Sequence, residues 1–269
     1  MRISDASLDW QKSDTYDYGK NLVHTDWAWE GLRRNRHFQQ SWQDARNRFQ
    51  VLEEHDHLRI IAAPEDDGLT RWGCLYTDAP DCNASDATVI WQPERYSRVL
   101  PMAAFTPDGA MRAAPFRLHD LRCCATLLMT PDGLQHLFIG NRGRSFQIAV
   151  TGASLLKPAH LLTEAILDPK NGGLRLKSLQ CFNDLRATGR LVRSHIPAQP
   201  SSPRMRMVIQ VLDGALAGVP YRDIAAVLFG KARVEREWDN RNRFLRDRIR
   251  RAVKRGRDLM NGGYLKFLR

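Results

Sequence analysis

The chain has 269 residues and a formal net charge of +11 at pH 7, which allows one large domain or two to three small ones. No apolar run approaches the ~18 to 20 residues of a membrane span, and the first 14 residues contain no apolar signal core, so we expect a cytoplasmic protein without a membrane partner. Its five cysteines form no C-x-x-C pair, which favours reduced thiols over a disulfide framework or a zinc site.

The first helical pattern runs from Thr25 to about Leu52, where aromatic and apolar residues recur at helical steps. Asp26 is a candidate cap, and Asn35 is a candidate break between two shorter helices. The first two dozen residues are polar, and we expect them to be loosely held. Tryptophans at helical spacing are more often core residues than a platform for a ligand.

Residues 58–150 change to short β-prone runs between clusters of Pro, Asp, Asn and Gly. The clearest runs are ATVIW (87–91), ATLLMT (125–130), LQHLFI (134–139) and SFQIAV (145–150). Turn sequences at 131–133 and 141–143 separate the last three runs, which predicts an antiparallel meander. We interpret Cys123 and Cys124 as strand residues.

Helical character returns at residues 159–191, with an interruption at Asn171-Gly172-Gly173, and a Pro- and Ser-rich connector follows at 196–203. The sequence then predicts a helix at 204–216 that stops at Gly218, and a second helix at 221–230. Pro220 introduces the second helix, and Gly230 is well placed for a left-handed C-cap.

A third helix is expected in the segment NRFLRDRIRRAVKRGRDL (242–259), with Asp239 or Asn240 as its cap. Its apolar residues follow steps of three and four: Leu245, Ile249, Ala252, Val253, Gly256, Leu259 and Met260. Nine cations occupy the remaining surface from Arg241 to Arg257, against two acids, Asp247 and Asp258.

This excess of one sign is unusual for a helix, because like charges at i,i+4 spacing repel one another. Residues 203–269 hold 17 Lys and Arg against 7 Asp and Glu, so the rest of the chain is close to neutral. A solvated structural face would mix both signs, and a membrane-surface helix would need a broader apolar face. RNA readers usually display stacking aromatics, and Phe244 is the only aromatic in this helix, so duplex DNA is favoured.

The last two helices suggest a helix-turn-helix, in which Ile224, Ala225 and Leu228 pack inward and the basic helix enters the major groove. The connection from Lys231 to Trp238 exceeds the usual three or four residues. It must therefore be a longer turn or contain a helical turn of its own.

Residues from about 161 to 269, especially YRDIAAVLFG, Val234 with Trp238, the Arg-rich helix and NGGYLKFLR, resemble the DNA-binding domain of RovC-type type VI secretion activators and of FseA-type activators. DWAWEGLRRNRHFQQSW (26–42) resembles the transcriptional-regulator-like region of the same proteins. The resemblance implies a bacterial activator that binds double-stranded promoter DNA as a homo-oligomer. RNA polymerase and an anti-activator protein are candidate partners.

Motifs of catalysis and cofactor binding were not found: G-x-x-x-x-G-K-[ST], G-x-G-x-x-G and H-E-x-x-H do not occur. The cluster from Glu53 to His57 holds metal-ligand residue types, but we interpret it as a solvated helix end. His119-Asp120 near Cys123 is a weak nucleophile constellation. We expect neither an enzyme nor a cofactor or metal site.

The sequence thus predicts an α+β protein with an N-terminal helical region (1–60), an antiparallel β-rich middle domain (61–158) and a helix-turn-helix-like DNA-binding domain (159–269). The alternative is a non-enzymatic module whose basic end binds an acidic regulatory protein, and a nucleic-acid-processing enzyme is a distant third. The candidate DNA-binding residues are Arg222, Arg241, Arg243, Arg246, Arg250, Lys254 and Arg257.

Overall fold

A computed structural model describes residues 9–55, 57–107, 114–140, 145–163, 172–189, 191, 202–238 and 244–269. The chain forms two compact units. We call Met1–Asn35 with Ala198–Phe267 the helical unit, and Arg36–Pro197 with Leu268–Arg269 the sheet unit. The division into three consecutive domains stays a prediction, whereas the α+β class is confirmed by the helices and strands described below.

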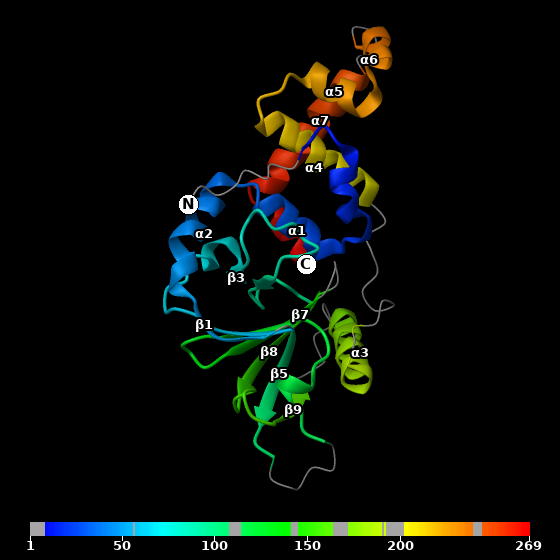
Figure 1. Ribbon diagram of the computed structural model, residues 1–269. Coiled ribbons are helices and arrows are strands. Elements are labelled where there is room, and N and C mark those ends of the chain that lie inside the picture. Colours follow the sequence, from blue (N-terminus) through cyan, green and yellow to red (C-terminus); the bar gives the residue numbers. More distant parts are fainter. Residues whose placement is uncertain are drawn as a thin grey trace. The chain divides into compact units, whose positions relative to one another are not determined.

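The helical unit combines the N-terminal segment with the C-terminal helices (Figure 1). Its elements are η1 (Ser13–Asn21), α1 (His24–Leu32), α4 (Ser202–Leu216), α5 (Tyr221–Phe229), α6 (Lys231–Glu237), α7 (Phe244–Met260) and the 3₁₀ turns of η6 (Gly263–Leu268), which end at the unit boundary. The three C-terminal helices expected from the sequence are confirmed as α4, α5 and α7. The connector at 196–203 lies mostly outside the described residues.

The N-terminal segment differs from its prediction, because from residue 9 onward it is folded rather than loosely held. Its 3₁₀ helix η1 packs on α4, and Tyr16 and Leu22 are fully buried. In α1, every residue from Thr25 to Leu32 is buried. Asp26 does not occupy the cap position. Its carboxylate instead accepts a hydrogen bond from the backbone N–H of Val23 at 2.8 Å, which closes the first turn of α1.

The sheet unit begins after Asn35, where the predicted break between two helices is confirmed. Its elements are α2 (Arg36–Ala45), η2 (Arg46–Arg48), β1 (Gln50–His55), β2 (Leu58–Ala62), η3 (Thr70–Trp72), β3 (Cys74–Thr77), β4 (Val89–Trp91), β5 (Leu100–Phe105), η4 (Leu118–Asp120), β6 (Ala125–Met129), β7 (Gln135–Gly140), β8 (Ser145–Gly152), β9 (His160–Thr163) and α3 (Gly172–Thr188). Seven strands form one sheet in the order β1-β2-β6-β7-β8-β5-β9, and β3 pairs with β4 separately.

The predicted meander is confirmed, since β6, β7 and β8 pair in antiparallel fashion. Gly133 has a φ of 83° in the first turn, as its position required. The sheet as a whole is mixed rather than antiparallel, because β2 pairs with β6 and β5 with β8 in parallel. Parallel pairing joins strands that are distant in sequence, so local turn signals could not reveal it.

Three local predictions were wrong. Residues 50–52 belong to β1 instead of a helix, because pairing with β2 satisfies their backbone. The segment 160–163 is β9, which pairs with β5, and Gly172 and Gly173 open α3 instead of interrupting a helix. Cys123 and Cys124 precede β6 by one or two residues and are not in a strand.

The core of the sheet unit lies between the large sheet and α3 (Figure 1). Phe182 of α3 contacts Phe116 and Phe146, with ring centroids 6.0 and 6.2 Å apart. Leu127 and Leu137 of the central strands are fully buried and belong to the same hydrophobic cluster as these rings. Burial of this apolar surface holds α3 on the sheet. Among the described helices, none is long and apolar enough to cross a membrane.

Candidate nucleic-acid interface

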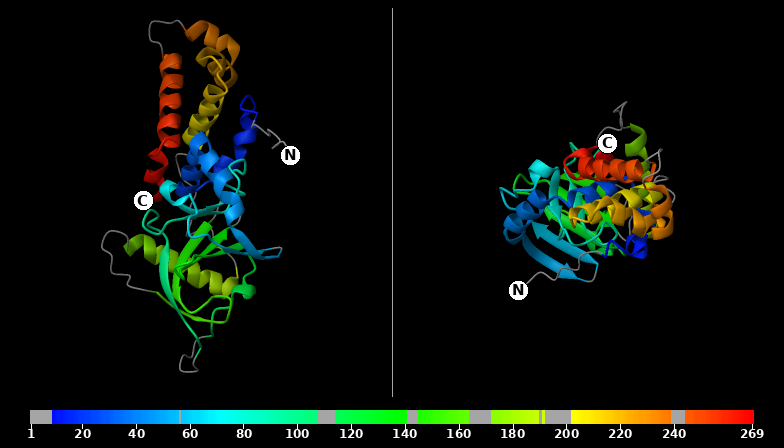
Figure 2. Two further views of the ribbon diagram at one scale, coloured as in Figure 1. Left: turned by 90° about the vertical axis from the view of Figure 1, so that its left-hand side faces the viewer. Right: turned by 90° about the horizontal axis from the view of Figure 1, so that it is seen from above.

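One edge of α7 anchors this helix in the core of the helical unit. Its buried residues are those of the predicted apolar stripe except Met260, which is only half-buried: Leu245, Ile249, Ala252, Val253, Gly256 and Leu259. They pack against side chains of α4, α5 and α6, among them Val211, Ile224 and Val234. Figure 2 shows α7 beside α4 over much of its length. The apolar pattern therefore fixes which face of α7 points inward.

Two glycines allow α7 to approach its neighbours closely. A Cβ added at Gly256 would lie 2.9 Å from Cβ of Leu212 in α4. A Cβ added at Gly31 of α1 would lie 2.5 Å from Cγ of Leu259. Real Cβ atoms do not approach other carbons this closely, so only glycine fits at these two positions. Helix α7 therefore packs closely against both α4 and α1, and this packing fixes its rotation about its own axis. The orientation of its opposite, charged surface is therefore defined.

A line of cations runs along one exposed flank of α7. Arg246, Arg250, Lys254 and Arg257 are all exposed and follow steps of four, four and three residues. Within the described part of the chain, Arg246, Lys254 and Arg257 form no ion pair with a carboxylate, and Arg250 has only a contact of 3.8 Å with Asp247. We call these four residues the cationic flank. Its charge is left largely uncompensated by the protein itself.

Two other arginines of the helical unit have interaction partners within the protein. The guanidinium of Arg248 lies over the ring of Phe229, 4.8 Å from its centroid, and contacts the sulfur of Met207 at 3.5 Å. Arg233 of α6 donates to both carboxylate oxygens of Glu237, at 3.1 and 3.0 Å. Arg248 thus joins α7 to α5 and α4, and Arg233 pairs within α6, so both arginines differ from the cationic flank in having partners inside the protein.

Of the other predicted site residues, the structure describes Arg222 but not Arg241 or Arg243. Arg222 is exposed in the first turn of α5, on the same unit as the flank. Arg241 and Arg243 lie outside the described residues, as do the expected capping residues Asp239 and Asn240.

The long connection between α5 and α7 contains a helix of its own. Helix α6 occupies residues 231–237 and turns its one buried side chain, Val234, into the shared core. Gly230 joins α5 to α6 with a φ of 89°, in the positive region that favours glycine. The second of the two alternatives for this connection is therefore correct. Three helices, not two, form this end of the helical unit.

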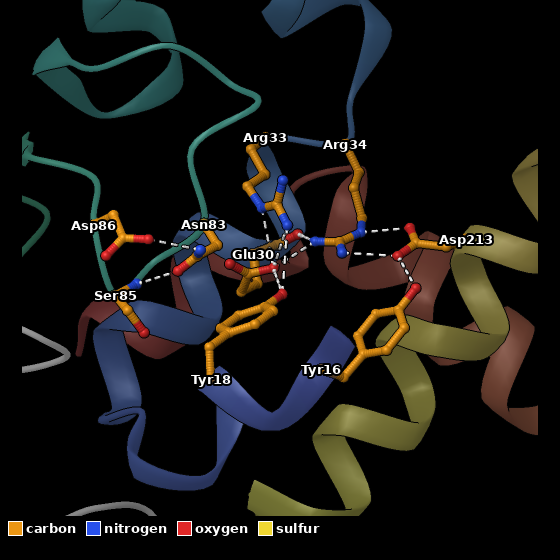
Figure 3. Close-up of polar contacts among 9 residues, drawn as sticks. All are labelled: Tyr16, Tyr18, Glu30, Arg33, Arg34, Asn83, Ser85, Asp86 and Asp213. Carbon is orange, nitrogen blue, oxygen red and sulfur yellow. Dashed lines mark hydrogen bonds and ion pairs between the residues drawn. The ribbon is translucent and has the colours of Figure 1, made fainter. Parts of the chain in front are cut away.

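A buried ionic network ties the N-terminal segment to α4 (Figure 3). Arg34 lies between two carboxylates: its Nη1 donates to Oε2 of Glu30 at 2.6 Å, and its Nε donates to Oδ1 of Asp213 at 2.6 Å. The hydroxyl of Tyr16 donates to Asp213 at 2.7 Å, and that of Tyr18 to Glu30 at 2.6 Å. Side chains from η1, α1 and α4 thus satisfy one another's charges and hydrogen bonds.

The pKa shifts in this network show that its charges are retained in the folded state. Burial by itself raises the pKa of Glu30, but the neighbouring Arg33 and Arg34 outweigh it and lower the pKa to about 2. Burial likewise lowers the pKa of Arg34, yet Asp213 and Glu30 raise it well above its ordinary value. Asp26, one turn before Glu30, has no such cation, and burial raises its pKa to about 7.

The structure also describes the residue clusters that the sequence offered as candidates for catalysis or metal binding. Glu53 and His55 lie in β1, not at a helix end, with His55 Nε2 3.1 Å and His119 Nε2 3.3 Å from Glu53 Oε1. Among the residues described, no group of three or more His, Cys, Asp or Glu could hold a metal ion. The five cysteines are free, and burial raises the pKa of Cys123 and Cys181 to about 11, which disfavours reactive thiolates.

The buried network was missed in the sequence. One signal was available: Glu30 stands three and four residues before Arg33 and Arg34, the spacing of helical ion pairs. Asp213 carries no comparable signal, because it lies 179 residues from Arg34.

Comparison with known families gives two matches. Residues 164–269 match the family described as T6SS transcription factor, DNA binding domain, and residues 9–76 match the proteobacterial transcriptional regulator-like domain. No curated protein matches the chain at a significant level. The resemblance stated from the sequence is thus confirmed. The cationic flank lies in the first matched segment, and the network of Figure 3 connects residues of both. One segment of the chain thus matches a proteobacterial transcriptional regulator-like domain and another matches a DNA-binding domain of type VI secretion transcription factors, and together these matches indicate a transcriptional regulator with a DNA-binding domain.

Proposed function

We propose that the protein is a transcriptional activator that binds promoter DNA through the cationic flank of α7. The observation that carries this proposal is a helix fixed along its apolar edge whose opposite cations have almost no carboxylate partners. Such a surface attracts an external polyanion, and its arginines suit bidentate contact with phosphates or guanine edges. Helices α5 and α6 would support α7 as a variant helix-turn-helix, with Arg222, Arg241 and Arg243 adding contacts to the DNA backbone.

Duplex DNA fits this surface better than its competitors. A single helix fills the major groove of B-DNA, whereas the major groove of A-form RNA is too narrow to admit one. A membrane-surface helix needs a free apolar face, and in α7 that face is buried against α4 and α5. An acidic protein remains the second candidate, since it would also match the unpaired cations.

The rest of the chain would serve regulation without catalysis. In this proposal, the sheet unit contributes contacts for assembly into a homo-oligomer and for RNA polymerase or an anti-activator protein.

The test is a charge reversal on the flank. The double variant Arg246→Glu, Arg250→Glu should abolish binding of the full chain to promoter fragments in a gel shift, because two attractive contacts become repulsive. Both side chains are exposed, so the unfolding midpoint should hardly change. The matched control is Arg95→Glu, Arg117→Glu, which changes the net charge equally at exposed positions of the sheet unit and should leave binding intact.

Two outcomes would contradict the proposal. If the flank variant retains DNA as well as the control does, α7 is not the binding element. If the unaltered chain shifts no duplex even at low salt, the acidic-protein alternative takes its place. Selection of bound fragments from genomic DNA then identifies the promoter that the chain recognises.

A further inference from the structure

Asp247 stands among the cations of α7 at the position farthest from the core. With 3.6 residues per turn, it lies about 180° around the helix from the middle of the buried edge. Its side chain is 45% exposed, and the neighbouring Arg250 is 75% exposed. A carboxylate here weakens the attraction of α7 for any polyanion. Its location in the first turn suits the helix dipole, but the dipole explains neither its outermost position nor its pairing with Arg250.

The contact between Asp247 and Arg250 is open, unlike the other ion pair at this end of the unit. Arg233 and Glu237 are joined by hydrogen bonds of 3.1 and 3.0 Å, which use the guanidinium Nε and both carboxylate oxygens. Asp247 Oδ1 and Arg250 Nη2 are 3.8 Å apart, beyond hydrogen-bond length. Their charges hold the two groups side by side while the carboxylate's acceptors and the guanidinium's donors stay available.

A carboxylate acceptor beside a guanidinium that can donate two parallel hydrogen bonds complements the major-groove edge of a single base pair. In the major groove, a G·C pair presents the N7 and O6 acceptors of guanine and the N4 amine of cytosine. We propose that Asp247 and Arg250 together read one G·C pair: Arg250 donates to N7 and O6 of the guanine, and Asp247 accepts from N4 of the cytosine. In an A·T pair, the N6 amine of adenine lies between the two acceptors, N7 of adenine and O4 of thymine. The guanidinium of Arg250 would then face this donor in place of a second acceptor.

This inference rests on the proposed function, since it requires α7 to lie in a DNA major groove. It separates two roles within the helix. Arg246, Lys254 and Arg257 would supply sequence-independent attraction to phosphates, and the Asp247–Arg250 pair would supply base preference.

The experiment is selection of bound duplexes from a randomised DNA pool by the full chain and three variants. Asp247→Asn and Arg250→Lys should both lose the preference at the same G·C pair, by at least about fivefold, because one loses the anionic acceptor and the other the two-pronged donor. Asp258→Asn is the matched control: it removes the other exposed acid of α7, gives the same change of charge as Asp247→Asn, and should keep the selected sequence. Unfolding midpoints are measured in parallel, and the exposed positions predict little change.

The results separate this inference from the proposed function. Loss of preference at one shared G·C pair in both variants, with the control unchanged, supports the inference. A preference that survives Asp247→Asn, changes at different base pairs in the two variants, or is missing from the unaltered chain while it still binds duplexes overturns the inference alone. Failure of the unaltered chain to bind any duplex overturns both.

Discussion

Arginine is used in two opposite ways in the helical unit. Arg34 is buried, with only 6% of its side chain exposed, and lies between the carboxylates of Glu30 and Asp213. Arg246 and Arg257 are exposed on α7 and form no ion pair with a carboxylate among the described residues. The first kind of arginine holds the N-terminal segment against α4, whereas the second kind is left for a partner outside the chain.

The comparison teaches that the number of arginines alone does not locate a binding surface. A buried guanidinium must be neutralised inside the protein because its desolvation is costly. An exposed guanidinium needs no internal partner, so only a row of unpaired cations on one helix, and not a single exposed arginine, marks a candidate surface for an external polyanion. Variants that change one kind of arginine should therefore affect stability, and variants that change the other should affect DNA binding.

The largest stability effect is expected for Arg34→Met. Removal of the guanidinium leaves Glu30 and Asp213 buried or partly buried without their shared cation. We expect the free energy of unfolding to fall by about 3–5 kcal/mol, measured by denaturant titration. The double variant Arg34→Met, Asp213→Asn removes this pair of charges together and leaves Glu30 with Arg33, so it should be less destabilised than the single variant. A single variant as stable as the unaltered chain would mean that the network does not hold the unit together.

A smaller effect is expected where α7 meets α4. Gly256→Ala places a methyl group where only 2.9 Å separates it from Cβ of Leu212, so one helix must shift. We expect a loss of about 1–3 kcal/mol in the free energy of unfolding. Gly173→Ala in α3 is the matched control, because nothing lies within 4 Å of its added Cβ, and it should be neutral or slightly stabilising. Equal effects of the two substitutions would argue against the close approach of α7 and α4.

The pH dependence of stability provides a third test, centred on Asp26. Burial raises its pKa from 3.8 to about 7, so between these values the folded chain keeps a proton that the unfolded chain has released. Its contribution to stability is therefore present below the lower value and decreases as pH rises, by at most about 1.4 kcal/mol per pH unit. Asp26→Asn, which carries no titrating proton, should flatten the curve between pH 5 and 7, roughly the upper part of this window.

Glu30 acts in the opposite direction and in a lower window. Its pKa is lowered from 4.5 to about 2, so its contribution to stability is present above the higher value and is lost as pH falls toward the lower one.

The exposed Asp258→Asn variant is the control for the Asp26→Asn prediction and should preserve the slope of stability against pH. If Asp26→Asn keeps the full slope above pH 5, the buried carboxylate is already ionised there.

The sequence predicted α7 well because a single local pattern determined its structure. The steps of three and four between Leu245 and Leu259 indicated both the helix and its buried edge, and that edge in turn indicated which cations are exposed. The meander was predictable for the same reason, since its strands follow one another closely in the chain. Local patterns could not reveal the parallel pairing of β2 with β6 or of β5 with β8.

The packing of α1 shows what sequence analysis missed. Residues 25–32 are buried on all sides, so the helix lacks the polar face that would indicate its orientation. Its polar residue Glu30 is buried because Arg33, Arg34 and Tyr18 satisfy the carboxylate. Asp213, the partner from α4, is distant in the sequence, so the joining of the N-terminal segment and the C-terminal helices into one unit could be seen only in the structure.

The salt dependence of duplex binding tests the central claim most directly. If the cationic flank meets DNA phosphates, the logarithm of the affinity should fall with the logarithm of salt concentration at about −0.9 for each phosphate engaged. Lys254→Gln and Arg257→Gln should each make this slope shallower by about 0.9, and Arg95→Gln in the sheet unit should not change it. A slope that stays the same in the Lys254 and Arg257 variants, or an affinity independent of salt, would contradict the assignment of α7 as the DNA-binding surface.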